Sequence, residues 1–567
     1  MKQTVAVSPE VRLRVRDVLL AVLASLILAA WVSRIFAVIP SGHIYENDNN
    51  AFNVYMFTDF REAIGTGHWF PQWSTYIHHG LGDAIFSYYE PGFFYLASIV
   101  PHRIEAARAM GIAVFLTLAL GSFSMWHLIG SRFGPESGIV AMTLFVLSNY
   151  AGTEVYLRGD YQELMAMMLL PLLLDSLLAW RRSHQGGWFV ASAVVAGALI
   201  VAHPIALAAY FCLVVCVIVE DIVVRHNVVA AVINGLPLPT GALLAAFYWF
   251  PVMFEMKLVQ ASAIFSGFDL YSRHFVGLRA LLGHFSDSPN VVPVALGPVL
   301  IASASLATVW LLVRKGSINH DQAVLLRMLM GITALAGFLI LRFSSWVWIL
   351  FPELQRLQFP WRILTLLTMG LAGIAATLFT GRYRNVAACI VISLAFLAYP
   401  YHVPVKFLTV PLARPADLIK LDYAQNELSV WPWLPKGAQP SPPAPFPEAY
   451  TTGGGCALTN FQIGQSLLKA SVDTTQGCVI HLPHYYFPGW HGSLNGFSIP
   501  VEEDDGWMTV RFPNGGRGTL MLVYGASPAR RIGLWVSATT SLFLVFCAAM
   551  ACWRTVQPEK VTDMVGI

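Results

Sequence analysis

Residues 18–39 have the sequence VLLAVLASLILAAWVSRIFAVI, an apolar run that decides the class of this protein. A transmembrane helix needs about 20 apolar residues, so this run is long enough to cross a bilayer. It follows Lys2, Arg12, Arg14 and Arg16, and a signal peptide has the same order of basic and apolar residues. No convincing cleavage site of small residues follows, so we expect an uncleaved membrane anchor.

Similar windows recur along the chain and predict a polytopic α-helical membrane protein. Hydrophobic residues make up 56% of the 567 positions and charged residues only 12%, about half of what soluble domains carry. Pro171 and Pro204 interrupt long apolar stretches, so the divisions between 136 and 224 are the least defined. The twelve predicted spans are 18–39, 107–130, 136–151, 164–180, 188–202, 205–224, 228–251, 291–313, 323–343, 360–380, 386–402 and 532–553.

Composition and motifs exclude several function classes. A net charge of +3 does not favour a nucleic-acid partner. The sequence has no Gly-rich phosphate loop ending in Gly-Lys-Ser or Gly-Lys-Thr, which argues against a nucleotide-driven pump. Cysteine and histidine spacings of the metal-binding kind are also missing, and the pair His78-His79 is better explained as part of a solvated loop.

The distribution of basic residues predicts the orientation, because cytoplasmic loops of membrane proteins are enriched in Lys and Arg. With the N-terminus inside, the short loops and the C-terminal tail on that side contain Arg132, Arg181, Arg182, Arg225, Arg314, Lys315, Arg382, Arg384, Arg554 and Lys560. The long connections 40–106, 252–290 and 403–531 then lie on the opposite side. Both termini are therefore expected in the cytoplasm.

Residues 403–531 form a separate extramembrane unit between the domain 1–402 and the last span with its tail, 532–567. The unit opens with a Pro-rich stretch and continues with short alternating apolar runs that end in turn signals such as Asn495-Gly496. This pattern predicts a β-rich module of the sandwich or jelly-roll-like kind. Five of the seven cysteines lie in or beside apolar spans, whereas Cys456 and Cys478 lie in this unit. Outside the cytoplasm they could form a disulfide that stabilises by about 3 kcal/mol.

Polar residues gather at the predicted outer ends of the spans, where buried charges usually mark function. The first group is the loop 45–91, with Asp48 and, near its end, Glu90. The other groups are 156–163, with Arg158 and Glu163; His203-Pro204; 247–255; and 357–362, with Gln358 and Arg362.

These groups carry a resemblance to a known family. The loop with Asp48, Phe70-Pro71-Gln72-Trp73, Gly80-x-Gly82 and Tyr88-Tyr89-x-Pro91 resembles the first outer loop of YfhO-like and related GT-C membrane glycosyltransferases. Arg158-Gly159 with Glu163, His203-Pro204, Phe247-Tyr248-Trp249-x-Pro251, Gln358-Phe359-Pro360-Trp361-Arg362 and Tyr486-Phe487-Pro488-Gly489-Trp490 resemble later signatures of the group. The similarity runs in order over nearly the whole chain.

The resemblance implies a GT-C-like fold and sugar transfer from a polyprenyl-phosphate donor at the periplasmic face of a bacterial inner membrane. The acceptor would be a lipid-linked glycan, a cell-envelope polymer, a lipid or a protein. Asp48 matches the carboxylate that activates the acceptor, with Glu90 and Glu163 as further catalytic candidates. Arg158 and Arg362 are candidates for the donor phosphate, since guanidinium groups bind phosphate oxygens in pairs. Gln358 and His203 are candidates for orienting the sugar or phosphate.

Asp48 stands between Asn47 and Asn49, and in this the sequence departs from those members of the resembled group that have two adjacent acids. One carboxylate between two amides is a poor site for a divalent cation, so no metal ligand is assigned and a cation requirement is left open.

Each assignment has a structural alternative. Asp48 could cap an exposed turn, and the two arginines could snorkel or pair with Glu163 or Glu353. His203 could simply bond to a helix end. At the level of function, the rivals are a glycolipid flippase and a non-catalytic assembly protein for envelope polysaccharide. Transporters usually place polar groups at the membrane midplane within repeated halves, a pattern that this sequence does not have.

Overall fold

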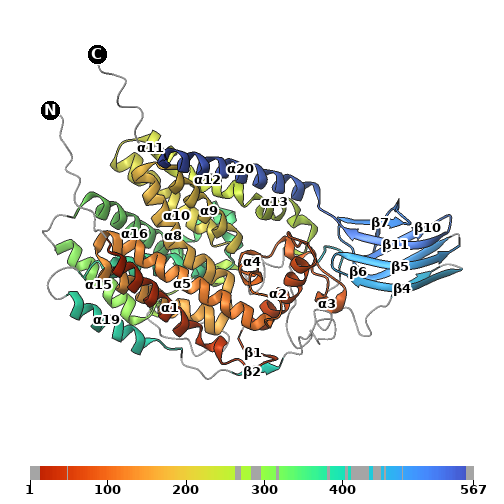
Figure 1. The fold of residues 1–567 in the computed structure, drawn as a ribbon, viewed down its shortest axis with the longest axis horizontal. Helices are drawn as coiled ribbons and strands as arrows, with labels where there is room; N and C mark the ends of the chain where they lie inside the picture. The colour runs from red at the N-terminus through yellow and green to blue at the C-terminus, as the bar shows by residue number, and fades with distance from the viewer. Residues whose placement is uncertain are drawn as a thin grey trace, which may run out of the picture.

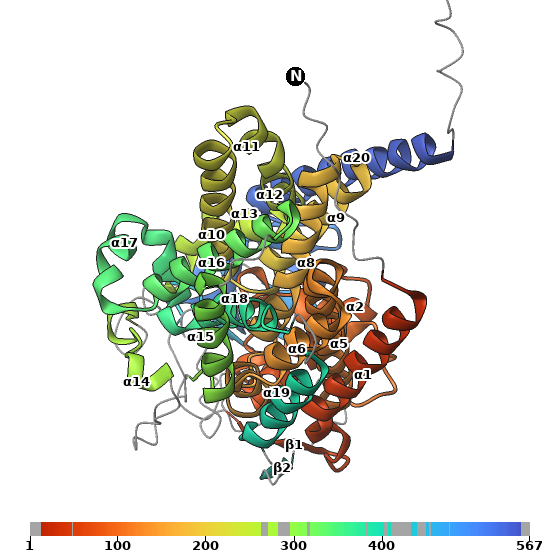
Figure 2. The same cartoon turned by 90° about the vertical axis from the view of Figure 1, so that its left-hand side faces the viewer.

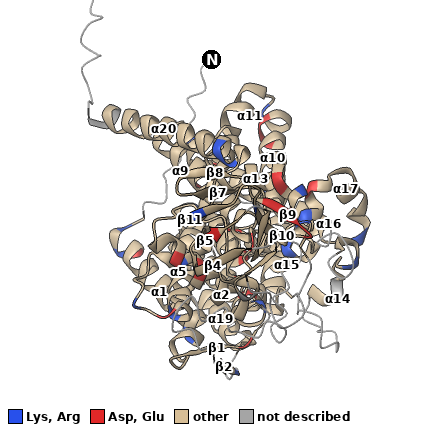
Figure 3. Ribbon diagram, turned by 90° about the vertical axis from the view of Figure 1, so that its right-hand side faces the viewer, with Lys and Arg blue, Asp and Glu red and all other residues tan. Residues whose placement is uncertain are grey.

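The computed structural model describes residues 13–47, 49–261, 270–281, 295–313, 318–379, 384–401, 406–409, 433–438, 449–452, 455–475 and 477–556. A large helical part and a β-sandwich lie at opposite ends of the long axis of the molecule (Figure 1). Charged residues occupy a small part of the ribbon (Figure 3), as the composition predicts.

The helical part contains nearly all the helices of the described residues. The longer ones are α1 (Val15–Ala37), α2 (Asn50–Gly65), α5 (Ala106–Phe133), α6 (Pro135–Val146), α8 (Tyr161–Ser183), α9 (Gly186–Ala202), α10 (Ala206–Ile218), α13 (Ala246–Glu255), α15 (Pro298–Val313), α16 (His320–Leu339), α18 (Leu364–Ala376), α19 (Arg384–Ala398) and α20 (Pro528–Val556). Shorter helices include α3 (Ile77–Gly80), α4 (Gly92–Ser98), α7 (Asn149–Thr153), α11 (Val228–Gly235), α12 (Pro237–Leu244), α14 (Leu278–Leu281) and α17 (Ser345–Leu350). Seen from the end away from the sandwich, α20 lies beside α9 and α12, and α1 lies beside α5 (Figure 2).

The chain is a multi-pass membrane protein. Six of its described helices are long and apolar enough to cross a membrane, and two bent helix pairs raise the number to 8. Shorter apolar helices occupy the windows near 188–202, 291–313, 360–380 and 386–402. Each of the twelve predicted windows thus contains an apolar helix, but four of these helices are short, so the number twelve remains a prediction. Outward-facing side chains of α20 such as Leu542 and Phe546 are 71% and 63% exposed, as expected of a lipid-facing surface.

The β-rich module predicted after residue 403 is a two-sheet antiparallel sandwich. One sheet has the order β3-β6-β10-β9 and the other β4-β5-β11-β7-β8. Their bounds are β3 (Tyr450–Thr452), β4 (Cys456–Gly464), β5 (Leu467–Thr474), β6 (Cys478–Tyr485), β7 (Trp490–Leu494), β8 (Phe497–Ile499), β9 (Glu502–Asp504), β10 (Trp507–Phe512) and β11 (Gly516–Tyr524). Alternate residues of β5 point inward, with Leu468 and Val472 buried and Lys469 and Asp473 exposed. Most of the Pro-rich stretch before the sandwich lies outside the described residues.

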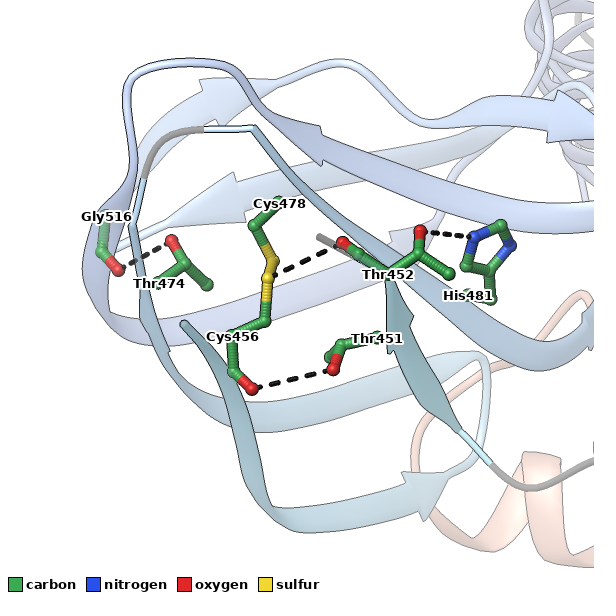
Figure 4. Close-up of a disulfide and its surroundings, with 7 residues drawn as sticks. All are labelled: Thr451, Thr452, Cys456, Thr474, Cys478, His481 and Gly516. Atoms are coloured by element: carbon green, nitrogen blue, oxygen red, sulfur yellow. Dashed lines mark hydrogen bonds between the residues drawn. A yellow bond between two sulfur atoms is a disulfide. The ribbon is translucent and has the colours of Figure 1, made fainter. Parts of the chain in front are cut away.

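A disulfide joins Cys456 on β4 to Cys478 on β6, the pair that the sequence singles out (Figure 4). Since β4 and β6 belong to different sheets, the bond ties the two sheets together, with the two Cα atoms 5.9 Å apart.

Replacing Cys456 and Cys478 together with serine should destabilise the sandwich by about 3 kcal/mol, because the bond closes a loop with a sequence separation of 22. Thermal unfolding of the full chain, with and without reductant, measures the effect. Replacing the exposed Cys389 and Cys552, which form no disulfide, with serine is the control, and should leave the reductant response of the wild type unchanged. Reductant-insensitive unfolding of the wild type would contradict the prediction.

Arg530, at the start of α20, fixes the sandwich to the helical part. It is 2% exposed and contacts three other segments. Nη1 donates to Gln72 Oε1 at 2.6 Å and to Tyr524 Oη at 3.0 Å, while Nε pairs with Glu255 Oε2 at 3.2 Å. Nη2 donates to Ser87 Oγ. The loop 66–91 is therefore held between the sandwich and α13.

An aromatic contact supports the same interface. The Trp73 ring lies 5.2 Å from the rings of both Trp490 and Tyr524 in the sandwich. Gly82 passes so close to Trp73 that a Cβ there would lie 2.4 Å from the ring, so only glycine fits. At the other edge of the helical part, β1 (His43–Tyr45) pairs with β2 (Phe407–Thr409).

Candidate functional site

The site begins where the bent α6–α7 segment meets α8. Glu154–Arg158 form a π-helical turn, a local widening of the helix that often occurs at functional sites. Gly159 follows at φ +64°, and a Cβ there would lie 2.6 Å from Asn47 Oδ1. Asp160 then caps α8 by accepting from the Glu163 backbone N–H at 3.0 Å. This sequence of turns directs the side chains of Glu154, Arg158, Asp160 and Glu163 into one buried cluster.

Arg158 is the centre of this cluster and is 4% exposed. Nη1 donates to both carboxylate oxygens of Glu154 at 2.6 Å and to Glu163 Oε2 at 2.8 Å. Nη2 donates to Asp160 Oδ2 at 2.8 Å, and Cζ lies 4.5 Å from the centre of the Trp361 ring. Arg158 is therefore already bound by three carboxylates and one aromatic face.

Arg362 contacts the same carboxylates more loosely. Nη2 lies 3.5 Å from Asp160 Oδ2, and Nε lies 3.2 Å from Glu163 Oε2 without the alignment of a hydrogen bond. Nη1 donates to Leu357 O at 3.3 Å and to Gln358 Oε1 at 3.4 Å. Arg362 also lies over the Phe359 ring, with Cζ 5.1 Å from its centre. Its two hydrogen bonds are long and therefore weak, so they can be exchanged for contacts to an anion in the cavity.

The backbone at Gln358 is strained. Its φ of 59° and ψ of −47° are unusual for a residue with a side chain, and Phe359 N–H donates to Leu357 O at 2.5 Å across it. This is a γ-turn of the rare positive-φ kind, which costs about 1–3 kcal/mol. The turn brings Arg356 and Arg362, from either side of it, to the wall of one cavity. Strain of this kind is found mainly at functional sites.

His203 and Glu90 complete the site. His203 Nε2 lies 3.9 Å from both Asp160 Oδ2 and Glu163 Oε2, and burial lowers the pKa of its imidazole well below the usual value. Burial raises the pKa of the Glu90 carboxyl to about 8, and the negative charges of Asp160 and Glu163 add to that effect. Burial would also raise the pKa of Asp160, but the charges of Arg158 and Arg362 hold it at about 2. Glu90 is thus mostly protonated at neutral pH, and Asp160 is ionised.

Asp160, Glu163 and His203 each offer a ligand atom within 4.8 Å of the others, a spacing that a metal ion could bridge. Two features of the chemistry argue against a cation there. The oxygens that face His203 are the ones held by Arg158 and Arg362. In addition, His203 Nδ1 accepts from the Ile205 backbone N–H at 3.2 Å, so the proton of the neutral ring is on Nε2. A metal would have to displace two guanidinium groups and that proton.

A cavity of about 430 Å³ adjoins the cluster. Seven of its lining residues are charged or otherwise polar: Glu90, Asp160, His203, Glu353, Arg356, Gln358 and Arg362. The lining residues from α9, α10, α12 and α13 are mainly apolar: Ile200, Leu207, Tyr210, Ala242, Trp249 and Met253. Tyr88 and Trp433 close the side toward the sandwich, with their rings stacked at 5.6 Å.

The structure brings together most of the residues that the sequence singles out, although they come from distant parts of the chain. Those that meet here are Glu90, Arg158, Glu163, His203, Gln358 and Arg362. Asp48 lies outside the described residues. Its neighbour Asn49 donates its backbone N–H to Arg158 O at 2.9 Å, and Asn47 lies against Gly159. The assigned pair Cys456 and Cys478 lies in the sandwich.

Three residues of the site were not assigned from the sequence: Glu154, Asp160 and Arg356. Asp160 stands in the polar group 156–163, so that group already contained the signal. Glu154 reaches the cluster because the π-helical turn changes the helix register, and Arg356 because the chain reverses at Gln358. Neither feature has a sequence pattern that would have predicted it.

No protein-family model matches this sequence, and no curated protein matches it. Among solved structures, the chain is similar to the cryo-electron microscopy structure of the arabinofuranosyltransferase AftD from Mycobacteria, at 18% identity and a TM-score of 0.40. The match covers 68% of this chain and 26% of AftD, so the chain spans about a quarter of that protein's length. A likeness at this level does not decide the reaction.

Proposed function

We propose that the chain is a GT-C-type glycosyltransferase that moves a sugar from a polyprenyl-phosphate donor to an acceptor hydroxyl. The observation that carries the proposal is one cavity that is lined by both charged and apolar side chains. Leu207 and Met253 line the cavity and are also 40% and 52% exposed, so the cavity opens to the molecular surface beside the apolar helices α10 and α13. A lipid-linked phosphate substrate has the same two parts, a charged head and an apolar chain.

Arg356 and Arg362 are the groups that would hold the phosphate. Arg356 lines the cavity and has no ion pair or hydrogen bond within the described part of the chain. Arg362 lines the same cavity and makes only long hydrogen bonds, at 3.3 and 3.4 Å, within the described part of the chain. Two guanidinium groups offer paired donors to phosphate oxygens and neutralise the charge of a leaving phosphate. The resemblance suggests Arg158 as a phosphate ligand. We propose that Arg158 instead holds Asp160 and Glu163 in place, the two carboxylates that Arg362 also contacts.

The transfer itself needs a base and a stabilised leaving group. The acceptor oxygen attacks the anomeric carbon, the bond from that carbon to the phosphate oxygen breaks, and the phosphate leaves with the bond electrons. The acceptor proton moves to a carboxylate. Glu90 lines the cavity and is our candidate base within the described residues. Asp48 is the second candidate, because its neighbours Asn47 and Asn49 contact the turn that contains Arg158 and Gly159.

The outer face of a bacterial inner membrane is the location we propose. The helices α2, α3 and α4 and the sandwich lie toward one end of the molecule, whereas α11, which follows the basic residue Arg225, lies toward the other end (Figure 1). A disulfide in the sandwich favours an oxidising compartment such as the periplasm. Both observations agree with cytoplasmic termini and a periplasmic site.

The test measures sugar transfer from labelled polyprenyl-phosphate sugars by purified protein, with membrane glycolipids as acceptors. Arg356→Ala should lower kcat/KM by about 10- to 100-fold, since a charge-assisted contact to phosphate contributes about 1.5–3 kcal/mol. Arg108→Ala is the control, because Arg108 is exposed and, among the described residues, forms an ion pair with Glu105 alone. No transfer from any donor, or equal loss in both variants, would contradict the proposal. Lipid movement across vesicles without transfer would support a flippase instead.

A further inference from the structure

The α10–α16 groove, of about 230 Å³, lies between α16 and the end of α10, where the helix continues as the π-helical segment η3 (Val219–Val224). Its lining comes from residues between 327 and 335 on one side and between 215 and 224 on the other. Val219 and Ala334 belong to this lining and are exposed, so the groove is open at the molecular surface. Both helices are long and apolar enough to cross a membrane, so a lipid chain can reach the groove.

The groove is charged at one end and apolar at the other. Its two sides run antiparallel, because Glu220 pairs with Arg327, whereas a Cβ on Gly331 would lie 2.9 Å from Cys216 Sγ. Glu220 and Arg327 are the charged residues of the lining, and the lining residues from there to 215 and 335 carry no charge. The eight-residue step from 327 to 335 makes the lining about 12 Å long. One leaflet of a bilayer has about 15 Å of hydrocarbon, so the groove can hold much of an acyl chain.

The charged end has a surplus of positive charge among the described residues. Two carboxylates, Glu220 and Asp221, lie within 4.0 Å of three guanidinium groups, those of Arg181, Arg225 and Arg327. The carboxylate side chains are 3% and 0% exposed, whereas those of Arg225 and Arg327 are 35% and 42% exposed. Nε and Nη1 of the buried Arg181 have no hydrogen-bond partner within the described part of the chain. The two acids therefore do not satisfy the cluster, and the charge that faces outward is positive.

We propose that the α10–α16 groove binds an anionic phospholipid, with the phosphate at Arg225 and Arg327 and one acyl chain along the apolar lining. Basic clusters beside membrane helices bind anionic head groups, and the apolar lining supplies the place for the chain. The groove shares no lining residue with the cavity of the candidate site, so this is a separate lipid site. In the orientation that we propose for the protein, the bound lipid belongs to the cytoplasmic leaflet.

The test measures lipid binding to the purified full-length protein by native mass spectrometry in a nonionic detergent. Dioleoyl phosphatidylglycerol is compared with dioleoyl phosphatidylcholine, which has the same chains but no net charge. The wild type should bind the anionic lipid about 5- to 30-fold more tightly, at about fivefold for each exposed arginine. Inorganic phosphate at the same concentration should not displace the lipid, because phosphate gains nothing from the apolar lining.

Two variants test the two ends of the groove separately. Arg327→Ala should weaken binding of the anionic lipid about fivefold. Ala334→Trp places a bulky side chain in the groove, keeps every ion pair and should weaken binding of both lipids. The matched controls are Arg182→Ala and Met330→Trp, because both residues are exposed and neither lines the groove; they should bind lipid like the wild type. Equal wild-type affinity for the two lipids, displacement by phosphate, or unchanged binding in Ala334→Trp would overturn the proposal.

Discussion

Arg158→Met should destabilise the membrane domain by about 3–5 kcal/mol, because it removes one partner from a buried ion network. Arg158 is 4% exposed and holds Glu154, Asp160 and Glu163. Among the described residues, Arg362 would then be the remaining guanidinium partner of Asp160, at 3.5 Å, and of Glu163, at 3.2 Å, and Glu154 would have lost its ion pair. The expected result is a melting temperature several degrees lower in detergent.

A second experiment tests whether the net charge of the network determines the stability. The wild-type network has three carboxylates and two guanidinium groups. Adding Glu154→Gln to Arg158→Met restores the original balance of charges, so the double variant should be more stable than Arg158→Met alone. Arg158→Lys keeps the charge but loses the forked geometry of the guanidinium group. Its melting temperature should therefore lie between those of the wild type and Arg158→Met. Equal melting temperatures for Arg158→Met and the exposed Arg108→Met would show that the network does not contribute to stability.

The fold could be predicted from the sequence in segments where the apolar residues follow one clear pattern, either a long apolar run or an alternation. Apolar runs near the length of a bilayer predicted the helices, and alternation in segments such as 467–474 predicted the sandwich. The number of spans could not be fixed. The pair α6–α7 bends by 43° and the pair leading into α13 by 69°, so these windows contain broken helices that hydropathy alone cannot divide.

The site could be predicted in part because charge is costly at membrane depth. That rule found Glu90, Arg158, Glu163 and Arg362 from separate segments. It did not distinguish their roles, since whether an arginine is free or already bound depends on neighbours such as Glu154. The register of Glu154 depends on a π-helical turn, and the direction of Arg356 depends on a γ-turn at Gln358. Both are local departures from regular geometry that only the packed structure imposes.

Transfer should rise with pH and reach half of its maximum near pH 8 if Glu90 is the base. Burial and the charges of Asp160 and Glu163 raise the pKa of Glu90 to about 8. Below that pH the carboxyl is protonated and cannot take a proton, so kcat/KM should fall about tenfold for each pH unit. The measurement is the pH profile of kcat/KM with a labelled donor.

Glu90→Gln should lower kcat by about 10²- to 10⁴-fold and remove the dependence on pH, since the amide cannot accept the acceptor proton. Glu90→Asp should keep part of the activity and a rising profile. Glu105→Gln is the control, because Glu105 is an exposed carboxylate outside the cavity. If Glu90→Gln keeps the wild-type profile while Asp48→Asn loses activity, the base is Asp48. Glu90 would then tune the charge beside Arg362, because a neutral carboxyl there leaves both guanidinium groups of the cavity wall available to the phosphate.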